Sequence, residues 1–245
     1  MVATPAWPPR SLPRLFVEAA LSEGAAVSVE GSGANYLANV LRLKAGDALL
    51  LFNGRDGEWL ARIVEPGRKR VTLTIAQATR EQETVPDLWL AFAPIKKGRV
   101  DWLVEKAVEL GVARLLPVIT ERTIVRDLNL ERMRSHIVEA AEQCGRTALA
   151  TIEAPARFGD WLAARPAGRT LYFADETGGP PFGEAIRPGP ATILVGPEGG
   201  FTPDEAARVR AAPGAVPVSL GPRILRAETA ALAAVTAWMA TAGDW

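Results

Sequence analysis

Cysteine and histidine are almost absent from the 245-residue chain, which contains one of each, Cys144 and His136. A single cysteine cannot form an internal disulfide, and one cysteine with one histidine cannot supply an ordinary zinc site. His136 lies in a charged stretch with helical spacing, where a surface or helix-packing role is expected. The sequence therefore predicts that the protein holds no metal.

Long apolar runs are also lacking. The longest candidate, Ala227–Ala240, is interrupted by Glu228 and Thr229 and is too short to span a membrane. Several prolines within the first 14 residues interrupt the continuous apolar stretch that a signal peptide needs. Because 48% of the residues are hydrophobic, we expect a folded globular protein, located in the cytoplasm and not attached to a membrane.

The chain has no net charge, since 28 Lys and Arg residues balance 28 Asp and Glu residues. This balance gives no support to a strongly electrostatic nucleic-acid binder. The distribution is uneven, because residues 1–80 contain ten basic and seven acidic residues, whereas the remainder contains eighteen and twenty-one. A mildly basic N-terminal third is compatible with a module that faces RNA, but does not by itself require one.

The N-terminal third has the pattern of a small β-rich domain. Three apolar or alternating segments of strand length are separated by turn residues: 48–52, 59–64 and 71–75. The first two flank the turn sequence NGRDG and predict a hairpin. Residues 36–43 could form a short helix between strands. A polar segment with a proline follows, so we expect one domain over residues 1–80 and another over residues 81–245.

Beyond residue 80, predicted strands alternate with predicted helices. The strands are expected at 88–93, 115–119, 170–173, 191–195 and 216–218. The helices are expected at 99–110, at a segment that ends near Gly145, at a segment that starts at Pro203 with Thr202 as its cap, and at 227–240. This alternation predicts an α/β fold with a mainly parallel sheet.

The sequence ILVGPEGGFTPDE, at 193–205, is the first segment that could bind a ligand. An apolar strand containing Leu194 runs into Gly196, Glu198, Gly199 and Gly200 before the next helix. In open α/β sheets, ligands bind beyond the carboxyl ends of the strands, where glycines allow close approach to the backbone. A tight turn without a ligand is the alternative. The spacing matches neither familiar nucleotide-binding glycine motif.

The sequence SLGPRILRAETAAL, at 219–232, is the second such segment. Glu228 is well explained by its place in the first turn of a helix, where an acidic residue is favourable. Arg223 and Arg226 are not explained in that way, because cations are unfavourable beside a helix N-terminus. Both arginines therefore indicate an anionic or electron-rich ligand.

Two further segments present cations beside predicted helices. In EAAEQCGR, at 139–146, a helix ends at Gly145 and presents Arg146, which could simply be solvated. In APIKKGRVDWLVEKAVELGV, at 93–112, a cluster of cations that includes Lys97 and Arg99 precedes a helix. Cations at that position again favour contact with a ligand over stabilisation of the helix.

Together these four segments resemble the RsmE family of SPOUT (trefoil-knot) methyltransferases, which methylate uracil N3 in small-subunit (16S) ribosomal RNA. The resemblance covers nearly the whole chain and includes RLFVE at 14–18 and YLANVLRLKAGD at 36–47. The last two motifs, close to the C-terminus, are its most specific part. One departure is Asn35-Tyr36, where many relatives have histidine.

The resemblance implies an α/β SPOUT trefoil-knot methyltransferase domain preceded by a small β-rich (PUA-like or OB-like) domain that recognises RNA. It also implies a homodimer with the site at the subunit interface, and S-adenosylmethionine held mostly by backbone in the knot. The apolar last helix supports the dimer, because its residues Leu232, Val235 and Met239 are expected to need a partner surface. The expected cofactor residues are Leu194, Gly196, Glu198, Gly199, Gly200, Leu220, Gly221, Ile224 and Leu225. The partner would be 16S ribosomal RNA or the small ribosomal subunit.

Methylation of uracil N3 requires loss of a proton and stabilisation of the charge that spreads onto O2 and O4. Arg223 and Arg226 are candidates for the second task, and Glu228 could be the base. The residues expected to contact the RNA are Arg14, Lys97, Arg99 and Arg146. Two alternatives are a non-catalytic RNA-binding protein, which intact glycine loops disfavour, and a SPOUT enzyme that acts on another target such as a tRNA ribose.

Overall fold

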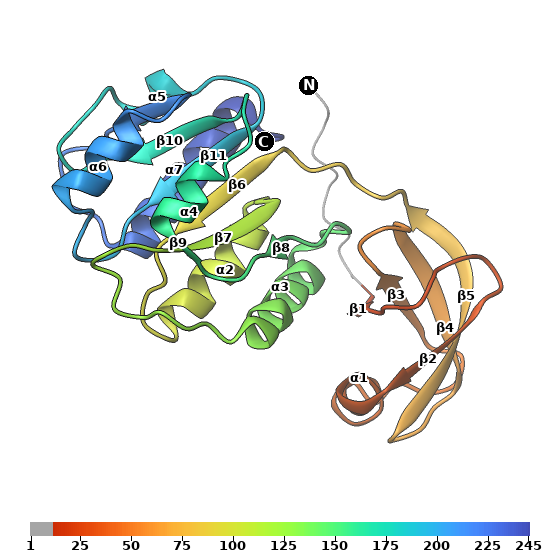
Figure 1. The fold of residues 1–245 in the computed structure, drawn as a ribbon. Helices are drawn as coiled ribbons and strands as arrows, with labels where there is room; N and C mark the ends of the chain where they lie inside the picture. The colour runs from red at the N-terminus through yellow and green to blue at the C-terminus, as the bar shows by residue number, and fades with distance from the viewer. Residues whose placement is uncertain (1–11) are drawn as a thin grey trace. The chain divides into compact units, whose positions relative to one another are not determined.

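A computed structural model describes residues 12–245, and its contacts divide the chain into two compact units (Figure 1). Unit 1 contains the described residues up to Glu83 together with Gly145–Ala148. Unit 2 contains Thr84–Cys144 and Leu149–Trp245. The chain thus leaves unit 1, forms part of unit 2, and returns to unit 1 for four residues.

Unit 1 is built on a five-stranded sheet in the order β1-β3-β4-β5-β2. Its elements are β1 (Arg14–Phe16), β2 (Ala26–Glu30), α1 (Gly31–Asn35), η1 (Tyr36–Val40, a π-helix), β3 (Ala48–Phe52), β4 (Glu58–Glu65) and β5 (Arg70–Arg80). β1 and β3 are parallel, and the remaining pairs are antiparallel. The expected hairpin is present as β3 and β4, with NGRDG as its turn.

The helical segment between β2 and β3 begins five residues earlier than the sequence predicted. Residues 31–35 read GSGAN, and glycine is a poor helix former, so helix propensity alone places the start at Tyr36. Ala34 and Leu37 are, however, fully buried against the sheet of unit 1. Their packing stabilises a helix over a segment of low propensity.

Unit 2 contains a parallel sheet in the order β12-β10-β11-β6-β7-β8, with β9 paired to β7. Its strands are β6 (Leu88–Phe92), β7 (Arg114–Ile119), β8 (Thr151–Ile152), β9 (Ala156–Arg157), β10 (Thr170–Ala174), β11 (Ala191–Val195) and β12 (Ala215–Val218). Its helices are α2 (Arg99–Glu109), α3 (Leu130–Cys144), α4 (Phe158–Ala163), α5 (Phe182–Ala185), α6 (Pro203–Arg210) and α7 (Ala227–Ala242). All the predicted strands and helices of this part are present.

Helices cover both faces of this sheet (Figure 1). Successive strand residues point to opposite faces, so Ile193 belongs to the core that includes residues of α2, α3, α5 and α7, whereas Leu194 belongs to the core that includes residues of α4 and α6. The resulting structure is a three-layer α/β/α arrangement with a core on each side of the sheet. Because the strands are parallel, the loops that follow β6, β7, β10, β11 and β12 all emerge at one edge.

α7 is buried more completely than the sequence suggested. Its apolar residues Leu232, Val235 and Met239 were expected to require the surface of a second subunit. Val235 and Met239 are instead fully buried within unit 2, where α7 packs against α2 and the sheet. The expectation is therefore wrong for these two residues. In the part of the chain that the structure describes, no helix has the length and apolarity needed to cross a membrane.

Candidate active site

A cleft of about 590 Å³ opens at the carboxyl ends of three neighbouring strands of unit 2, β10, β11 and β12. The loops that follow these strands form most of its wall. The cleft thus occupies the position where ligands bind in open α/β sheets, and its volume lies in the range of cofactor sites. Both glycine-bearing motifs that the sequence singled out lie on it.

The loop after β11 is shaped by close packing around its glycines. A Cβ on Gly196 would lie 2.6 Å from the ring of Phe201, and Gly200 has a left-handed φ of 68°. Arg122, which follows β7, donates hydrogen bonds to the carbonyls of Gly199 (2.8 Å) and Phe201 (3.2 Å). Thr202 then caps α6, as predicted, in a reciprocal pair with Glu205. The loop is therefore fixed at its start by the packing of Phe201 against Gly196, and at its end by Arg122 and the cap of α6.

The loop after β12 supplies the opposite part of the wall. Leu220, Gly221, Arg223, Ile224 and Leu225 all line the cleft. The Ile224 side chain is 98% exposed, which is unusual for a large aliphatic residue. Gly221 has a φ of 108°, a conformation that favours glycine. This loop presents an apolar side chain and a cation to whatever binds there.

Arg99, the first residue of α2, lies between two acidic residues of the predicted site. Its guanidinium is 3.9 Å from Glu198, in the loop after β11, and 3.7 Å from Glu228, in the first turn of α7. Glu228 is only 8% exposed, and its Oε2 atom has no hydrogen-bond partner among the described residues. The structure thus brings three residues from separate motifs into one cluster.

Six predicted residues of unit 2 do not line the cleft, namely Arg99 and Glu228, which belong with Glu198 to the cluster just described, and Leu194, Gly199, Lys97 and Arg226. Leu194 is buried in the core, with its side chain packed among those of the α4 and α6 layer. Gly199 lies against Arg122, Lys97 is exposed in the loop before α2, and Arg226 is an exposed residue at the N-terminus of α7. Their proposed contacts stay predictions.

Arg14 and Arg146 both lie in unit 1, and both are almost fully buried. Arg14 donates to Glu58 (2.7 Å) and to the carbonyl of Arg146 (2.9 Å), and Arg146 lies 3.9 Å from Glu83. Burial alone would raise the pKa of Glu58, but hydrogen bonds from Arg80 and Arg14 outweigh it and lower that pKa. These contacts give both arginines structural partners, and their expected role in RNA binding stays a prediction.

The loop after β10 also belongs to the site, although it was not predicted from the sequence. Asp175, Glu176 and Thr177 from this loop line the cleft, and Asp175 pairs with Arg210 of α6 at 2.6 Å. The sequence ADETGG places polar residues and two glycines directly after a predicted strand, which is the same signal that marked the loop after β11. Arg122 was also missed, because only the fold brings it to the glycine loop.

Comparison with known proteins identifies the family. Residues 62–239 match the family model of the RNA methyltransferase domain, and residues 29–76 match that of the RNA methyltransferase PUA domain. Ribosomal RNA small subunit methyltransferase E of Rickettsia conorii is 32% identical over 228 residues, which cover 91% of this chain and 93% of the relative. The chain belongs to the ribosomal RNA small subunit methyltransferase E (RsmE) family.

Solved structures agree with this assignment to the RsmE family. The crystal structure of ribosomal RNA small subunit methyltransferase E from Neisseria gonorrhoeae, bound to S-adenosyl methionine, is 31% identical, with a TM-score of 0.88 over 95% of this chain and 99% of that one. A Legionella pneumophila protein in complex with the cofactor SAM is 29% identical, with a TM-score of 0.87 over 96% and 100%. The predicted family and fold class, a SPOUT knot domain preceded by a small PUA-like domain, are confirmed.

Proposed function

We propose that this RsmE family member transfers a methyl group from S-adenosylmethionine to N3 of a uridine in 16S ribosomal RNA. The observation that carries the proposal is the cleft of about 590 Å³, formed by three loops at the carboxyl edge of the sheet. A relative with the same fold over 95% of this chain binds S-adenosyl methionine. The substrate of the curated relatives, small-subunit ribosomal RNA, is named in their descriptions.

The residues of the cleft fit the proposed cofactor. Its apolar wall, which includes Phe173 and Leu225, suits a flat aromatic base, whereas exposed backbone at Gly196 and Gly221 suits polar contacts. The exposed carboxylate of Glu176 forms no ion pair within residues 12–245 and suits a cationic group. When bound, the cofactor would supply an electrophilic methyl group that needs no activation by the protein.

The protein's own task is to make uracil N3 nucleophilic. Glu228 could accept the N3 proton at Oε2, the buried atom that lacks a partner, while Arg99 keeps the carboxylate in place. Arg223 and Arg226 could stabilise negative charge on O2 and O4, since a guanidinium offers several donors in one plane. Glu198, also beside Arg99, is a candidate for binding polar groups of the cofactor.

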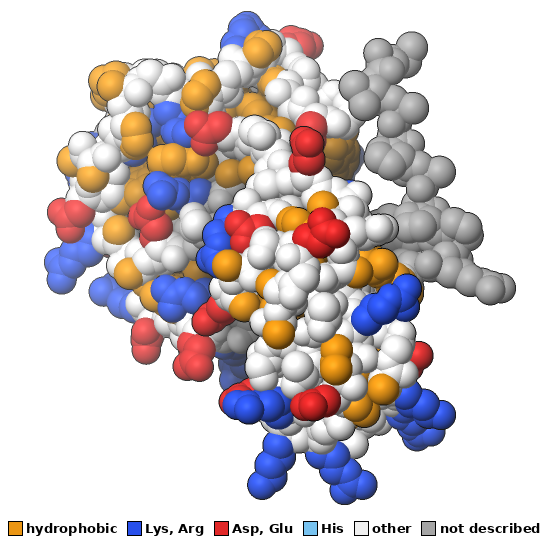
Figure 2. Space-filling view, turned by 90° about the vertical axis from the view of Figure 1, so that its right-hand side faces the viewer, with side chains coloured by type: hydrophobic (Ala, Val, Ile, Leu, Met, Phe, Trp, Pro, Cys, Tyr) orange, Lys and Arg blue, Asp and Glu red, His pale blue; other side chains and the backbone are white. Residues whose placement is uncertain are grey.

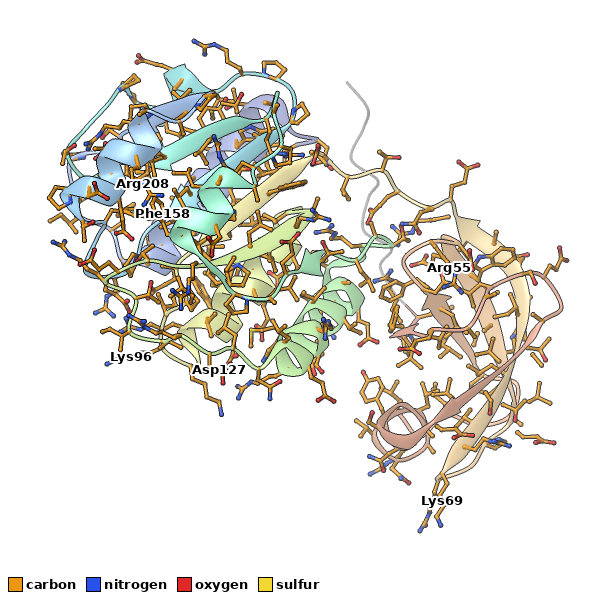
Figure 3. All side chains as sticks on the ribbon, viewed as in Figure 1. Arg55, Lys69, Lys96, Asp127, Phe158 and Arg208 are labelled. Atoms are coloured by element: carbon orange, nitrogen blue, oxygen red, sulfur yellow. The ribbon has the colours of Figure 1, made fainter. Side chains whose placement is uncertain are left out.

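RNA recognition is assigned in this proposal to unit 1 and to the cations near the cleft. The turn between β4 and β5 is basic, with Arg68 and Lys69 both exposed, and Figure 3 labels Lys69 at its tip. In Figure 2, blue side chains project at the lower end of the face shown. Lys97, Arg14 and Arg146 remain further candidates. A ribosomal substrate also implies action in the cytoplasm.

A homodimer is the proposed assembly. Val235 and Met239 no longer support it, because both are buried within the chain. Its support is the family resemblance, together with Ile224, an almost fully exposed aliphatic side chain in a loop of the site. Light scattering at micromolar concentration that reports only a 26.2 kDa species would refute this assembly.

Single-turnover transfer of a labelled methyl group tests the function. Wild-type protein should label small ribosomal subunits that lack the modification, and should not label large subunits. Arg226→Lys keeps the charge but loses the planar fork, so transfer should slow by about one hundred-fold, the scale of losing one donor to a developing oxyanion. Cofactor affinity, measured by calorimetry, should change little. Unchanged transfer would remove Arg226 from the site, and labelling of neither subunit would refute the proposed function.

A further inference from the structure

A second hollow, of about 480 Å³, lies beside the proposed active site in unit 2. The two hollows are formed by consecutive residues of the same two segments. Arg122 lines the first and Glu121 the second, while Pro203 lines the first and Asp204 the second. The second hollow therefore adjoins the methyl-transfer cleft across the loop after β7 and the first turn of α6.

Three arginines from separate elements line this second hollow. Arg126 comes from the loop between β7 and α3, Arg157 from the end of β9, and Arg208 from α6. Within residues 12–245, none of the three forms an ion pair with a carboxylate. Arg210, two residues along the same helix, is in contrast paired with Asp175 at 2.6 Å. The hollow thus gathers guanidinium groups whose charge is not neutralised by a partner.

One of the three arginines is held in a defined orientation. The guanidinium carbon of Arg208 lies 5.3 Å from the centroid of the buried Phe158 ring, and Figure 3 labels the two residues side by side. One guanidinium nitrogen of Arg208 would be 3.2 Å from a Cβ on Gly159, so the backbone of α4 is also close. A guanidinium held in this way can bind a phosphate or stack on a base at a smaller cost in side-chain entropy.

The three acidic residues of the hollow form no ion pair with its three arginines within residues 12–245. Both carboxylate oxygens of Glu205 accept backbone N–H groups, from Glu121 at 2.9 Å and Thr202 at 3.0 Å. Asp204 lies in the first turn of α6, where the peptide dipoles favour a negative charge. Glu121 is exposed, and its side chain has neither of these two roles. The lining of the hollow therefore has no net charge, but its guanidinium groups are not paired with these carboxylates and can bind discrete anionic groups.

We propose that this hollow binds phosphodiester groups of the RNA strand that flanks the target nucleotide. The inference rests on the proposed function, since it assumes an RNA substrate in the adjoining cleft. Arginine matches phosphate oxygens through paired hydrogen bonds, and single-stranded RNA is commonly held by phosphate contacts combined with stacking on guanidinium planes. An enzyme that acts on a base must hold the neighbouring nucleotides while that base enters the active site.

The test uses the full-length protein, unmodified small ribosomal subunits, and the triple variant Arg126→Ala, Arg157→Ala, Arg208→Ala. The subunit concentration that gives half-maximal transfer should rise at least tenfold, while the maximal rate and the cofactor affinity stay within about twofold. The logarithm of the RNA-binding constant falls linearly with the logarithm of the salt concentration. The slope of this line should become less steep by about 0.7 for each phosphate that the variant no longer binds. Arg134→Ala, which removes an exposed arginine of α3, is the matched control and should change none of these quantities.

Two additional variants keep the test decisive. A triple arginine-to-lysine variant retains the charges, so it should preserve the salt dependence and recover part of the affinity, even if the alanine variant folds poorly. Glu121→Gln should tighten binding, because it removes the exposed carboxylate. Triple variants of either kind that match Arg134→Ala in affinity and salt dependence would overturn the site. Failure of the wild-type protein to methylate, with RNA binding still dependent on these arginines, would instead refute the proposed function alone.

Discussion

Gly199 and Gly200 are adjacent in the sequence but have different backbone requirements. A Cβ on Gly199 would meet only the side chain of Arg122, whose Cβ would be 3.5 Å away, an ordinary contact. Gly200 has a φ of 68°, and a Cβ there would lie 2.6 Å from a carboxylate oxygen of Glu176. Glu176 is exposed and can move away, so the left-handed backbone is the stronger constraint at Gly200.

Gly200→Ala should therefore weaken cofactor binding by about tenfold, because a left-handed alanine costs roughly 1–2 kcal/mol and the loop would relax out of its binding shape. Gly199→Ala, one residue away, should change the dissociation constant by less than about twofold, a small fraction of that energy. Isothermal calorimetry with S-adenosylmethionine measures both. Equal affinities for the two variants would contradict the role given to the shape of this loop.

Glu58 is a second residue whose environment leads to a quantitative expectation. Its side chain is 5% exposed and is paired with Arg14, which is 8% exposed. Removing one partner of a buried ion pair leaves the other charge unpaired, so Glu58→Gln should lower the free energy of unfolding at pH 7 by about 3 kcal/mol. Glu30→Gln disrupts the exposed pair with Arg70 and should cost less than about 1 kcal/mol.

The effect of Glu58→Gln should depend on pH with a definite sign. The pKa of Glu58 is lowered in the folded protein by its arginine partners, so its stabilising effect is fully present above the ordinary glutamate pKa of about 4.3. The effect is lost as the pH falls through the lower, folded pKa. Denaturant unfolding should thus show the difference between wild type and variant shrinking below about pH 4. A difference that stayed constant down to about pH 2 would contradict this account.

At the scale of elements, the local sequence predicted most of the structure that positions the site. Apolar runs such as 191–195 form buried parallel strands, and Thr202 caps α6 as its side chain and the following proline predicted. α1 was not predicted, because burial of Ala34 and Leu37 overrides the low helix propensity of GSGAN. The contact of Arg122 with the glycine loop could not be predicted, since it joins residues far apart in the sequence.

The link between β7 and the loop after β11 can be tested through Arg122. Arg122→Ala removes two hydrogen bonds to loop carbonyls, and the loss of about 1.5 kcal/mol should raise the cofactor dissociation constant by about tenfold. Arg187→Ala is a matched control, because that guanidinium also donates to two carbonyls, those of Glu184 and Ile186, but does not line the cleft. A similar change in both variants would mean that general stability, and not the loop, accounts for the effect.

At the scale of the whole molecule, the path of the chain explains why the division into two units could not be fully predicted from the sequence. The sequence predicted domains at 1–80 and 81–245 from a change in composition. Gly145–Ala148 nevertheless belongs to unit 1, where its carbonyls accept hydrogen bonds from Arg14 and Arg80. A four-residue return of the chain leaves no periodicity or composition signal. Removing residues 1–80 would also remove these partners, so point variants are the better way to separate the units.

The identity of the methylated nucleoside tests the central claim most directly. Small ribosomal subunits from cells that lack the enzyme would be incubated with the purified protein and S-adenosylmethionine. Their 16S RNA would then be digested to nucleosides and analysed by mass spectrometry against synthetic standards. We predict that N3-methyluridine accumulates to about one equivalent per subunit, and that the Gly200→Ala variant forms it about tenfold more slowly at a cofactor concentration well below its dissociation constant. A methyl group found on a ribose, on another base or only on transfer RNA would contradict the account.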